Sequence, residues 1–211
     1  MTSTFKASAW DGLASSVISD CVDRFQVMDS TIRSLTHQRV VGPAFTVQTM
    51  VGENSTIHRA VYDAPAGSVL AIDAGGHDQR AVWGEVLTVA AKRVGIVGVV
   101  IDGAVRDIDA LRKASYPVFA RAVCAAGPHK GWRGRIGTSI QCGGVVVNTG
   151  DILVGDEDGV VVVPREVADE IAAAARQRAV DESSWIERVD AGETTLEILG
   201  NAPVTGDKQR S

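Results

Sequence analysis

Residues 68–121 read SVLAIDAGGHDQRAVWGEVLTVAAKRVGIVGVVIDGAVRDIDALRKASYPVFAR, and this stretch decides the fold of the chain. It contains three apolar runs of strand length, SVLAIDA (68–74), IVGVVIDG (96–103) and YPVFAR (116–121). Two segments with helical periodicity separate the runs: GEVLTVAAKRV (84–94) and a shorter one that begins at about Asp107. Strands and helices that alternate at this spacing predict a βαβαβ unit, with parallel strands buried on both faces.

Shorter elements are predicted on both sides of this unit. Helices are expected over 12–27 and over 55–64, the second capped by Ser55, and AFTVQTMV is expected as a strand. Residues 133–163 contain short strands parted by glycine turns, which predicts an antiparallel or barrel-like β layer. A helix from Arg165 to about 189 is expected to close the core, with a short last helix at TTLEILG. We therefore predict an α/β protein with a single domain over 1–211, whose core spans about 12–200 and whose tail, 201–211, is polar.

Composition excludes several classes of function. With 45% hydrophobic, 22% charged and 5% aromatic residues, the chain has the profile of a soluble α/β protein. Its net charge of −5 gives no general attraction to nucleic acid, and its longest apolar run, 94–101, is too short to span a membrane. The three cysteines lie far apart, which favours a reducing, cytoplasmic location over a disulfide framework or a structural zinc site. The short basic stretch 129–135 is interpreted as a polar hairpin or strand edge.

Polar residues cluster where the strands of the unit end. In a parallel sheet, ligands bind beyond the carboxyl ends of the strands. The residues expected at that edge are Asp73, Gly75, Gly76, His77 and Asp78 after the first strand, Gly84 and Glu85 at the start of the helix, and Asp102, Arg106 and Asp107 after the second strand. Carboxylates, an arginine and a helix N-terminus suit a small anionic substrate that is bridged to a divalent cation such as Mg²⁺ or Mn²⁺.

Each of these residues also has an ordinary structural interpretation. Asp107 could cap the helix that it begins, Arg106 could be a surface arginine, and Glu85 could be a favourable acid in a first helical turn. The pair Gly75-Gly76 could form a simple turn. It is their convergence on one edge of the sheet that favours a functional site.

Several longer segments of the chain resemble a known family. AVWGEVLTVAA (81–91), VVIDGAVRD (99–107), PVFA (117–120) and GGVVVNTGDILVGDEDGVVVVP (143–164) are similar to the RraA-like family, which includes the 4-hydroxy-4-methyl-2-oxoglutarate (4-carboxy-4-hydroxy-2-oxoadipate) aldolases. The family signature begins with an acidic residue or glycine, which is followed by twenty intervening residues and then by Arg-Asp. Another acidic residue comes soon after this pair. Glu85, Arg106, Asp107 and Asp109 stand at these places. The likeness spans roughly residues 12–200.

The resemblance implies a swivelling β/β/α fold, like that of phosphohistidine domains, assembled as trimers or dimers of trimers with active sites in the clefts between subunits. It implies a divalent metal at Asp107, Arg106 on the oxygens of pyruvate, and the backbone of Gly84, Glu85, Val86 and Leu87 around the substrate carboxylate. Glu85 takes the place of an aspartate in the known aldolases. Glu182 is the candidate for an acidic residue that a neighbouring subunit contributes; its alternative is a solvated ion pair with Arg178.

Chemistry distinguishes two routes to the pyruvate enolate that an aldol cleavage needs: a lysine Schiff base, or a metal acting as Lewis acid. None of the five lysines ends a buried strand, so the metal route is favoured. We expect a class II aldolase that cleaves 4-hydroxy-2-oxo acids to pyruvate and also decarboxylates oxaloacetate, with Glu85 or Glu182 orienting the catalytic water. The histidines lack a shared ligand spacing; His77 could line the site with Asp78, whereas His58 is expected on a helix face. The alternative is a non-catalytic RraA-type regulator that binds ribonuclease E or another protein.

Overall fold

The computed structural model describes residues 5–200. Within this range a mixed sheet has the strand order β1-β5-β4-β3-β2-β9-β10, with β6 paired to β2, and β7 and β8 form a separate two-stranded sheet. The strands are β1 (Arg33–Ser34), β2 (Val40–Gln48), β3 (Val69–Trp83), β4 (Gly98–Val105), β5 (Val118–Val123), β6 (Arg135–Ile136), β7 (Ile140–Cys142), β8 (Val145–Val147), β9 (Ile152–Asp156) and β10 (Gly159–Val163).

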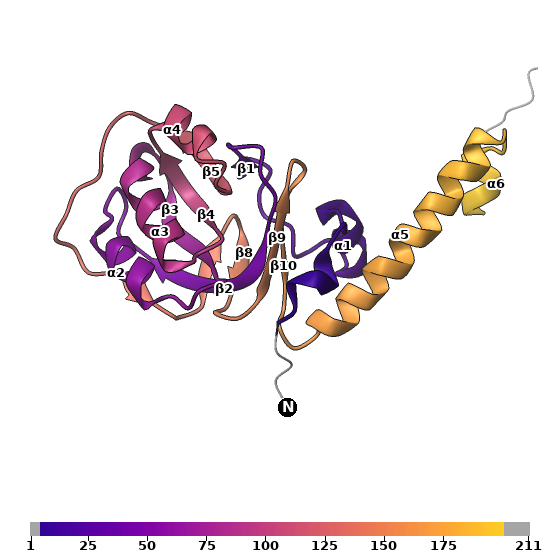
Figure 1. The fold of residues 1–211 in the computed structure, drawn as a ribbon, viewed down its shortest axis with the longest axis horizontal. Helices are drawn as coiled ribbons and strands as arrows, with labels where there is room; N and C mark the ends of the chain where they lie inside the picture. The colour runs from indigo at the N-terminus through magenta and orange to yellow at the C-terminus, as the bar shows by residue number, and fades with distance from the viewer. Residues whose placement is uncertain (1–4, 201–211) are drawn as a thin grey trace, which may run out of the picture.

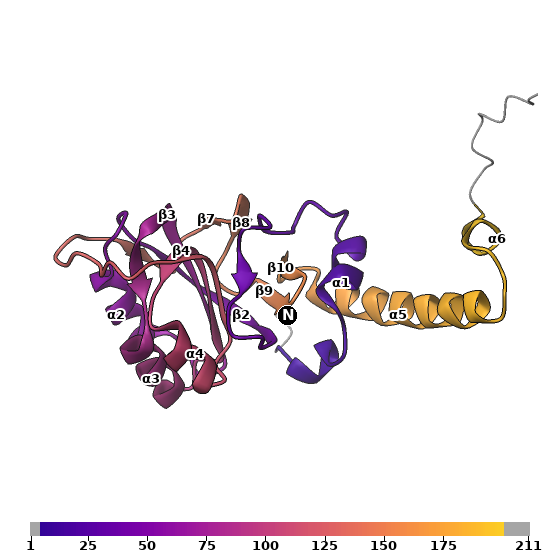
Figure 2. The ribbon, with the colours of Figure 1, turned by 90° about the horizontal axis from the view of Figure 1, so that it is seen from above.

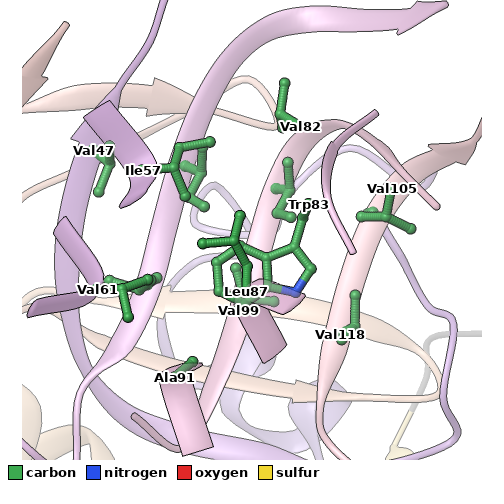
Figure 3. Packing of buried hydrophobic residues seen from close by; sticks show 14 of the residues in the cluster. Val47, Ile57, Val61, Val82, Trp83, Leu87, Ala91, Val99, Val105 and Val118 are labelled. Carbon is green, nitrogen blue, oxygen red and sulfur yellow. The ribbon is translucent and has the colours of Figure 1, made fainter. Parts of the chain in front are cut away.

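The predicted βαβαβ unit is confirmed as β3, α3 (Glu85–Val94), β4, α4 (Ile108–Lys113) and β5. The strands β2, β3, β4 and β5 are parallel to one another. The three helices α2 (Ser55–Asp63), α3 and α4 cover one face of these strands (Figure 1). In the core beneath them, Leu87 of α3 lies beside Trp83 and Val99 (Figure 3). Since α3 and α4 directly follow β3 and β4, their N-termini lie at the carboxyl edge of the sheet.

The opposite face of the parallel strands carries the predicted β layer. Residues of β7 and β8, among them Ile140, Cys142 and Val147, pack there against Ala71, Val100 and other strand residues. The hairpin β9–β10 joins the main sheet through antiparallel pairing of β9 with β2. Its outer face is covered by the 3-10 helix η1 (Ala7–Trp10), by α1 (Ser15–Cys21) and by the start of α5 (Ala168–Asp190). The mixed α/β fold predicted from the sequence is confirmed; the single-domain organisation over 1–211 stays a prediction, and the tail 201–211 lies outside the described residues.

Three predictions about elements were wrong in detail. The first strand of the unit was predicted to end at residue 74, but β3 continues to Trp83, past positive-φ Gly75 and Gly76 and with shifts of register against β4. The helix predicted over 12–27 ends at Cys21, because Asp23 and Arg24 adopt left-handed conformations that a right-handed helix cannot contain. The N-cap of α2 is Asn54, one residue before the predicted Ser55.

The helix expected to close the core does so only at its beginning. Ala172 and Ala175 are its buried residues, and Ala179 still packs against the body. Beyond Ala179, α5 projects from the body and ends in α6 (Thr195–Leu199) (Figures 1 and 2). This projecting arm exposes Val180, Ile186 and Val189 to solvent. Within residues 5–200, no helix combines the length and apolar character that crossing a membrane requires.

Candidate functional site

The carboxylate of Asp107 connects β4 to the N-terminus of α3. Its Oδ2 atom accepts a hydrogen bond of 3.1 Å from the backbone N–H of Glu85, the first residue of α3. Asp107 is also the N-cap position of α4, but its side chain accepts no hydrogen bond from that helix. Its φ of 59° is a left-handed conformation, which aspartate adopts more readily than most residues. The side chain of Asp107 therefore does not cap α4. It bonds instead to the first residue of α3, and this bond holds the carboxylate at the edge of the sheet.

Arg106 lies beside this carboxylate. Its Nε atom is 3.7 Å from Asp107 Oδ2, and its backbone N–H donates to the carbonyl of Trp83 at 2.9 Å. Both side chains are partly exposed, at 44% for Arg106 and 40% for Asp107. The predicted pair is thus brought together in a position that a ligand can reach from solvent.

Gly84 makes this arrangement possible. A Cβ atom at residue 84 would lie 2.5 Å from Asp107 Oδ2 and 3.1 Å from Arg106 Cγ. The backbone of Gly84 is extended, so the glycine is needed for space and not for its conformational freedom. The next residues, Val86 and Leu87, belong to the first helical turn, whose N–H groups have no carbonyl partner within the helix. These donors point toward the same edge as Arg106.

These residues line a cleft of about 380 Å³, a volume suited to a small molecule. The lining residues are Asn54, His58, Ala81, Val82, Trp83, Gly84, Val86, Leu87, Arg106, Asp107, Gly127, Pro128 and Lys130. Four of the five residues predicted to contact substrate are among them. The side chain of Glu85 is exposed and is absent from the lining, although its backbone N–H binds Asp107.

Three polar residues of the cleft were missed by sequence reasoning. Lys130 Nζ lies 2.7 Å from Asn54 Oδ1 and 3.0 Å from His58 Nε2. His58 is on α2, as predicted, but it faces the cleft. Lys130 lies in the stretch interpreted as a polar hairpin or strand edge. The structure places it in the loop between β5 and β6, where Gly131 N–H donates to Ser55 Oγ of α2 at 3.0 Å, and the stretch ends at Arg135 in β6, which pairs with β2. The one available signal was the local excess of basic residues in 129–135.

Two predicted site residues lie on the other face of the sheet, and placing them at the cleft was wrong. Asp102 accepts hydrogen bonds from Arg121 Nε at 2.7 Å and from Gly143 N–H at 2.8 Å, next to the β7–β8 layer. Asp73 accepts from Gln48 Nε2 at 3.0 Å. Successive residues of a strand face opposite sides, and Ile72 and Ile101, the neighbours of these aspartates, face the helices. His77 and Asp78, in the irregular part of β3, are also absent from the cleft lining.

Glu182 lies on the projecting arm, not in the cleft of its own chain. Its Oε1 accepts a hydrogen bond of 3.0 Å from Arg178 Nε, and the Arg178 guanidinium stacks 4.6 Å from the ring centre of Trp185. The alternative ion pair with Arg178 is therefore formed. Arg178 also donates from Nη2 to Asp20 Oδ2 of α1 at 3.0 Å, so the ion pair lies at the base of the arm. The role of Glu182 in a neighbouring subunit stays a prediction.

The donor set of the cleft fits a hydrated hard cation. Among residues 5–200, no group of three or more His, Cys, Asp or Glu side chains could hold a metal ion. A fully ligated zinc site needs such a group. Mg²⁺ is usually held by one or two carboxylates and keeps several waters. Asp107, a half-exposed carboxylate in an open cleft beside Arg106, fits that second pattern.

Adding a single methyl group at residue 84 should damage the site without disturbing the core. In Gly84→Ala, the new Cβ would displace Asp107 and Arg106, and misplacing reactive groups by about 1 Å can cost on the order of 100-fold in rate. For the aldolase activity that the resemblance implies, pyruvate release should fall by about 10- to 100-fold, with an unchanged melting temperature. Wild-type activity in Gly84→Ala would contradict the packing of Gly84 against Asp107.

The fold and the cleft together define a mixed α/β protein with a polar cleft at the carboxyl edge of its parallel strands. The chain belongs to the RraA-like family: the family model described as Aldolase/RraA matches residues 15–162. A protein of Halalkalibacterium halodurans named "Putative 4-hydroxy-4-methyl-2-oxoglutarate aldolase" is 40% identical over 168 residues, covering 79% of this chain and 80% of the relative. The 4-hydroxy-4-methyl-2-oxoglutarate aldolase of Thermus thermophilus is 33% identical over 112 residues, covering 53% of this chain and 68% of the relative.

Solved structures show the same fold. An uncharacterized protein of Pseudomonas syringae pv. tomato superimposes with a TM-score of 0.82 at 28% identity, covering 95% of this chain and 96% of its own. The RNA-processing inhibitor RraA of Thermus thermophilus superimposes with a TM-score of 0.66 at 28% identity, covering 72% of this chain and 92% of its own. At the level of the family, the two relatives named as aldolases support a lyase of the aldolase type that takes a small substrate.

Proposed function

We propose that this protein is a divalent-metal-dependent, class II aldolase that cleaves 4-hydroxy-2-oxo acids, such as 4-hydroxy-4-methyl-2-oxoglutarate, to pyruvate. The observation that carries the proposal is the grouping of Arg106, Asp107 and the N-terminus of α3 in one cleft. An arginine fork and unpaired helix N–H groups bind carboxylate oxygens, and a lone carboxylate beside them can hold Mg²⁺ or Mn²⁺. The names of the aldolase relatives agree with this chemistry.

Each residue has a defined part in the cleavage. Val86 and Leu87 N–H would bind the carboxylate of the pyruvyl half, and Arg106 would hold its 2-oxo oxygen. Removal of the proton from the C4 hydroxyl turns C4 into a carbonyl and breaks the C3–C4 bond, and the electron pair moves onto C3 as the pyruvate enolate. Arg106 stabilises the negative charge that develops on the enolate oxygen. A cation held by Asp107 would act there as a Lewis acid. Glu85 and Glu182 are the candidate carboxylates for assisting the proton transfer.

Decarboxylation of oxaloacetate is expected at the same site, because loss of its C4 carboxylate leaves the same enolate. The deciding experiment measures pyruvate release from 4-hydroxy-4-methyl-2-oxoglutarate and from oxaloacetate, with Mg²⁺ or Mn²⁺ and with EDTA. We expect release with either metal and none with the chelator. Release that is insensitive to EDTA would contradict the metal-dependent mechanism, and no release under any condition would contradict the aldolase assignment.

A non-catalytic regulatory function is the second candidate, because one structural neighbour is an RNA-processing inhibitor. That neighbour matches 72% of this chain. The same assay separates the two functions, since a regulator without catalysis releases no pyruvate. Binding to ribonuclease E, measured in the absence of substrate, would then support the regulator.

Assembly into trimers or dimers of trimers is expected to complete the site. The projecting arm exposes apolar residues that a second copy of the chain could cover, and it carries Glu182. Light scattering should give a mass near three or six times that of the 22.2 kDa chain. Mixing inactive Asp107→Asn and Glu182→Gln subunits should restore part of the activity, because some hybrid clefts contain both wild-type residues. A fully active monomer would contradict the shared site.

A further inference from the structure

A chain of hydrogen bonds runs from the buried core to the carboxylate of Asp107. The indole Nε1–H of Trp83 donates to Thr88 Oγ1 at 2.8 Å, and Thr88 Oγ1 donates to the carbonyl of Gly84 at 3.1 Å. The peptide group that contains this carbonyl also contains the backbone N–H of Glu85, which donates to Asp107 Oδ2 at 3.1 Å. A single peptide group therefore connects Thr88 to the carboxylate that the proposed function assigns to the metal.

The direction of each bond follows from the chemistry of its partners. An indole N–H can only donate, so Thr88 Oγ1 must accept from Trp83. The hydroxyl hydrogen of Thr88 then remains for the carbonyl of Gly84, which can only accept. The side chains of Trp83 and Thr88 are buried, and a hydrogen bond in such an interior is stronger than one exposed to water. The hydroxyl of Thr88 is thus held in one arrangement.

The Gly84 carbonyl and the Glu85 N–H move as one unit, because a peptide group is planar. Turning the carbonyl away from Thr88 would turn the N–H away from Asp107. Gly84 cannot hold this peptide with a side chain of its own, since a Cβ atom there would clash with Asp107. The carbonyl also accepts the ordinary helical bond from the backbone N–H of Thr88 at 3.1 Å. The hydroxyl adds the contact that links the peptide to the core.

The indole bond distinguishes Thr88 from an ordinary helical threonine. A threonine hydroxyl in a helix often bonds to the carbonyl four residues earlier, and it needs no further partner to do so. Here the hydroxyl is also anchored to Trp83, whose ring is packed in the core beside Leu87 and Val99 (Figure 3). The backbone carbonyl of Trp83 accepts from the N–H of Arg106 at 2.9 Å. Trp83 thus supports both residues of the Arg-Asp pair.

We propose that Thr88 is a positioning residue: it holds the Gly84–Glu85 peptide, and this peptide holds Asp107 in the orientation that binds a divalent cation. The inference rests on the proposed function for the cation and for the reaction that the cation serves. Thr88 is buried and does not line the cleft, so it acts only through the peptide. Loss of its hydroxyl should weaken metal binding without removing a ligand of the metal.

Two substitutions at residue 88 test the role of the hydroxyl. Thr88→Val removes it while keeping the shape of the side chain, and Thr88→Ser retains it. Calorimetric titration with Mn²⁺ should give an affinity about 10-fold lower in Thr88→Val, at the lower end of the range for groups that orient a metal ligand. The affinity of Thr88→Ser should be close to that of wild type. If serine does not preserve the affinity, the hydroxyl is not the group that positions Asp107, and the proposal is overturned.

Thr36→Val is the matched control. Thr36 is also buried, and its Oγ1 donates to the carbonyl of Tyr116 at 2.8 Å and accepts from the N–H of Val118 at 3.2 Å. It does not line the cleft. Thr36→Val should lower the melting temperature and leave the Mn²⁺ affinity unchanged. An equal loss of affinity in Thr36→Val and Thr88→Val would indicate a general loss of packing and would contradict the positioning role.

A double variant separates stability from positioning. Thr88→Val leaves the buried indole N–H of Trp83 without an acceptor, which destabilises the fold, whereas Trp83→Phe removes that donor. The double variant Trp83→Phe/Thr88→Val should therefore regain part of the melting temperature that Thr88→Val loses. Its Mn²⁺ affinity should nevertheless stay low, because the Gly84–Glu85 peptide is still not held. Recovery of the affinity together with the stability would assign Thr88 a purely structural role.

Hydrogen exchange at the Glu85 amide tests the link without metal or turnover. In metal-free protein, exchange should be about 10-fold faster in Thr88→Val than in wild type, because the bond to Asp107 opens more often. It should be unchanged in Thr36→Val. If the variants behave in this way but wild type binds no Mn²⁺ or releases no pyruvate, the metal-dependent aldolase proposal fails and the positioning of Asp107 by Thr88 stands. An unchanged exchange rate in Thr88→Val would overturn the inference.

Discussion

Asp107→Asn should abolish metal-stimulated pyruvate release while the protein remains folded. Asparagine preserves the size of the side chain and can still accept a hydrogen bond from Glu85 N–H, so the link between β4 and α3 survives. It loses the negative charge, which is the property that a hard divalent cation requires of its ligand. We expect kcat/KM to fall by at least about 100-fold. The measurement is pyruvate release as a function of Mg²⁺ or Mn²⁺ concentration.

The control for Asp107→Asn is Asp158→Asn, which makes the same chemical change in the exposed turn between β9 and β10. It should have wild-type activity. Calorimetric titration with Mn²⁺ adds a readout that does not depend on turnover: binding should be lost in Asp107→Asn and retained in the control. Full metal-stimulated activity in Asp107→Asn would remove Asp107 from the metal site.

Arg106→Lys should lose most of its activity although the positive charge is kept. The guanidinium presents a planar fork that can bind two oxygens at once, whereas an ammonium acts as a single point charge. The guanidinium also lies close to Gly127, where a Cβ atom would be 2.9 Å from Nη1. We expect a loss of about 100-fold or more in kcat, with a smaller change in KM, because the fork is needed most when charge develops on the enolate oxygen.

Arg93→Lys, near the end of α3 and exposed, is the matched control for Arg106→Lys and should behave as wild type. The two constants, kcat and KM, must be measured separately, since a change in KM alone would indicate a loss of general substrate attraction. If lysine at residue 106 supports full activity, Arg106 contributes only a positive charge and the bidentate contact is wrong.

The sequence by itself determined the elements that place the site. Near-continuous apolar runs of strand length, separated by helical segments, sufficed to predict β3, β4 and β5 as parallel strands, because local periodicity and length carry this information. Parallel strands present their carboxyl ends at one edge of the sheet. This rule predicted that Arg106 and Asp107 lie near the start of α3, as the structure has them. Contacts that follow directly from strand order are within reach of sequence reasoning.

Tertiary structure alone decided the rest. Asp73 and Asp102 lie within β3 and β4, the strands that lead to the cleft residues, yet they face the β7–β8 layer. A strand buried on both faces gives no polar alternation that would show which side a given residue takes. Lys130 and Asn54 are 76 residues apart in the chain, and a loop without periodicity brings them together. Such contacts depend on where a whole loop packs, which a local sequence pattern does not encode. For the same reason, the sequence indicated the Arg-Asp pair of the cleft, but only the folded chain revealed the lysine that faces the same space.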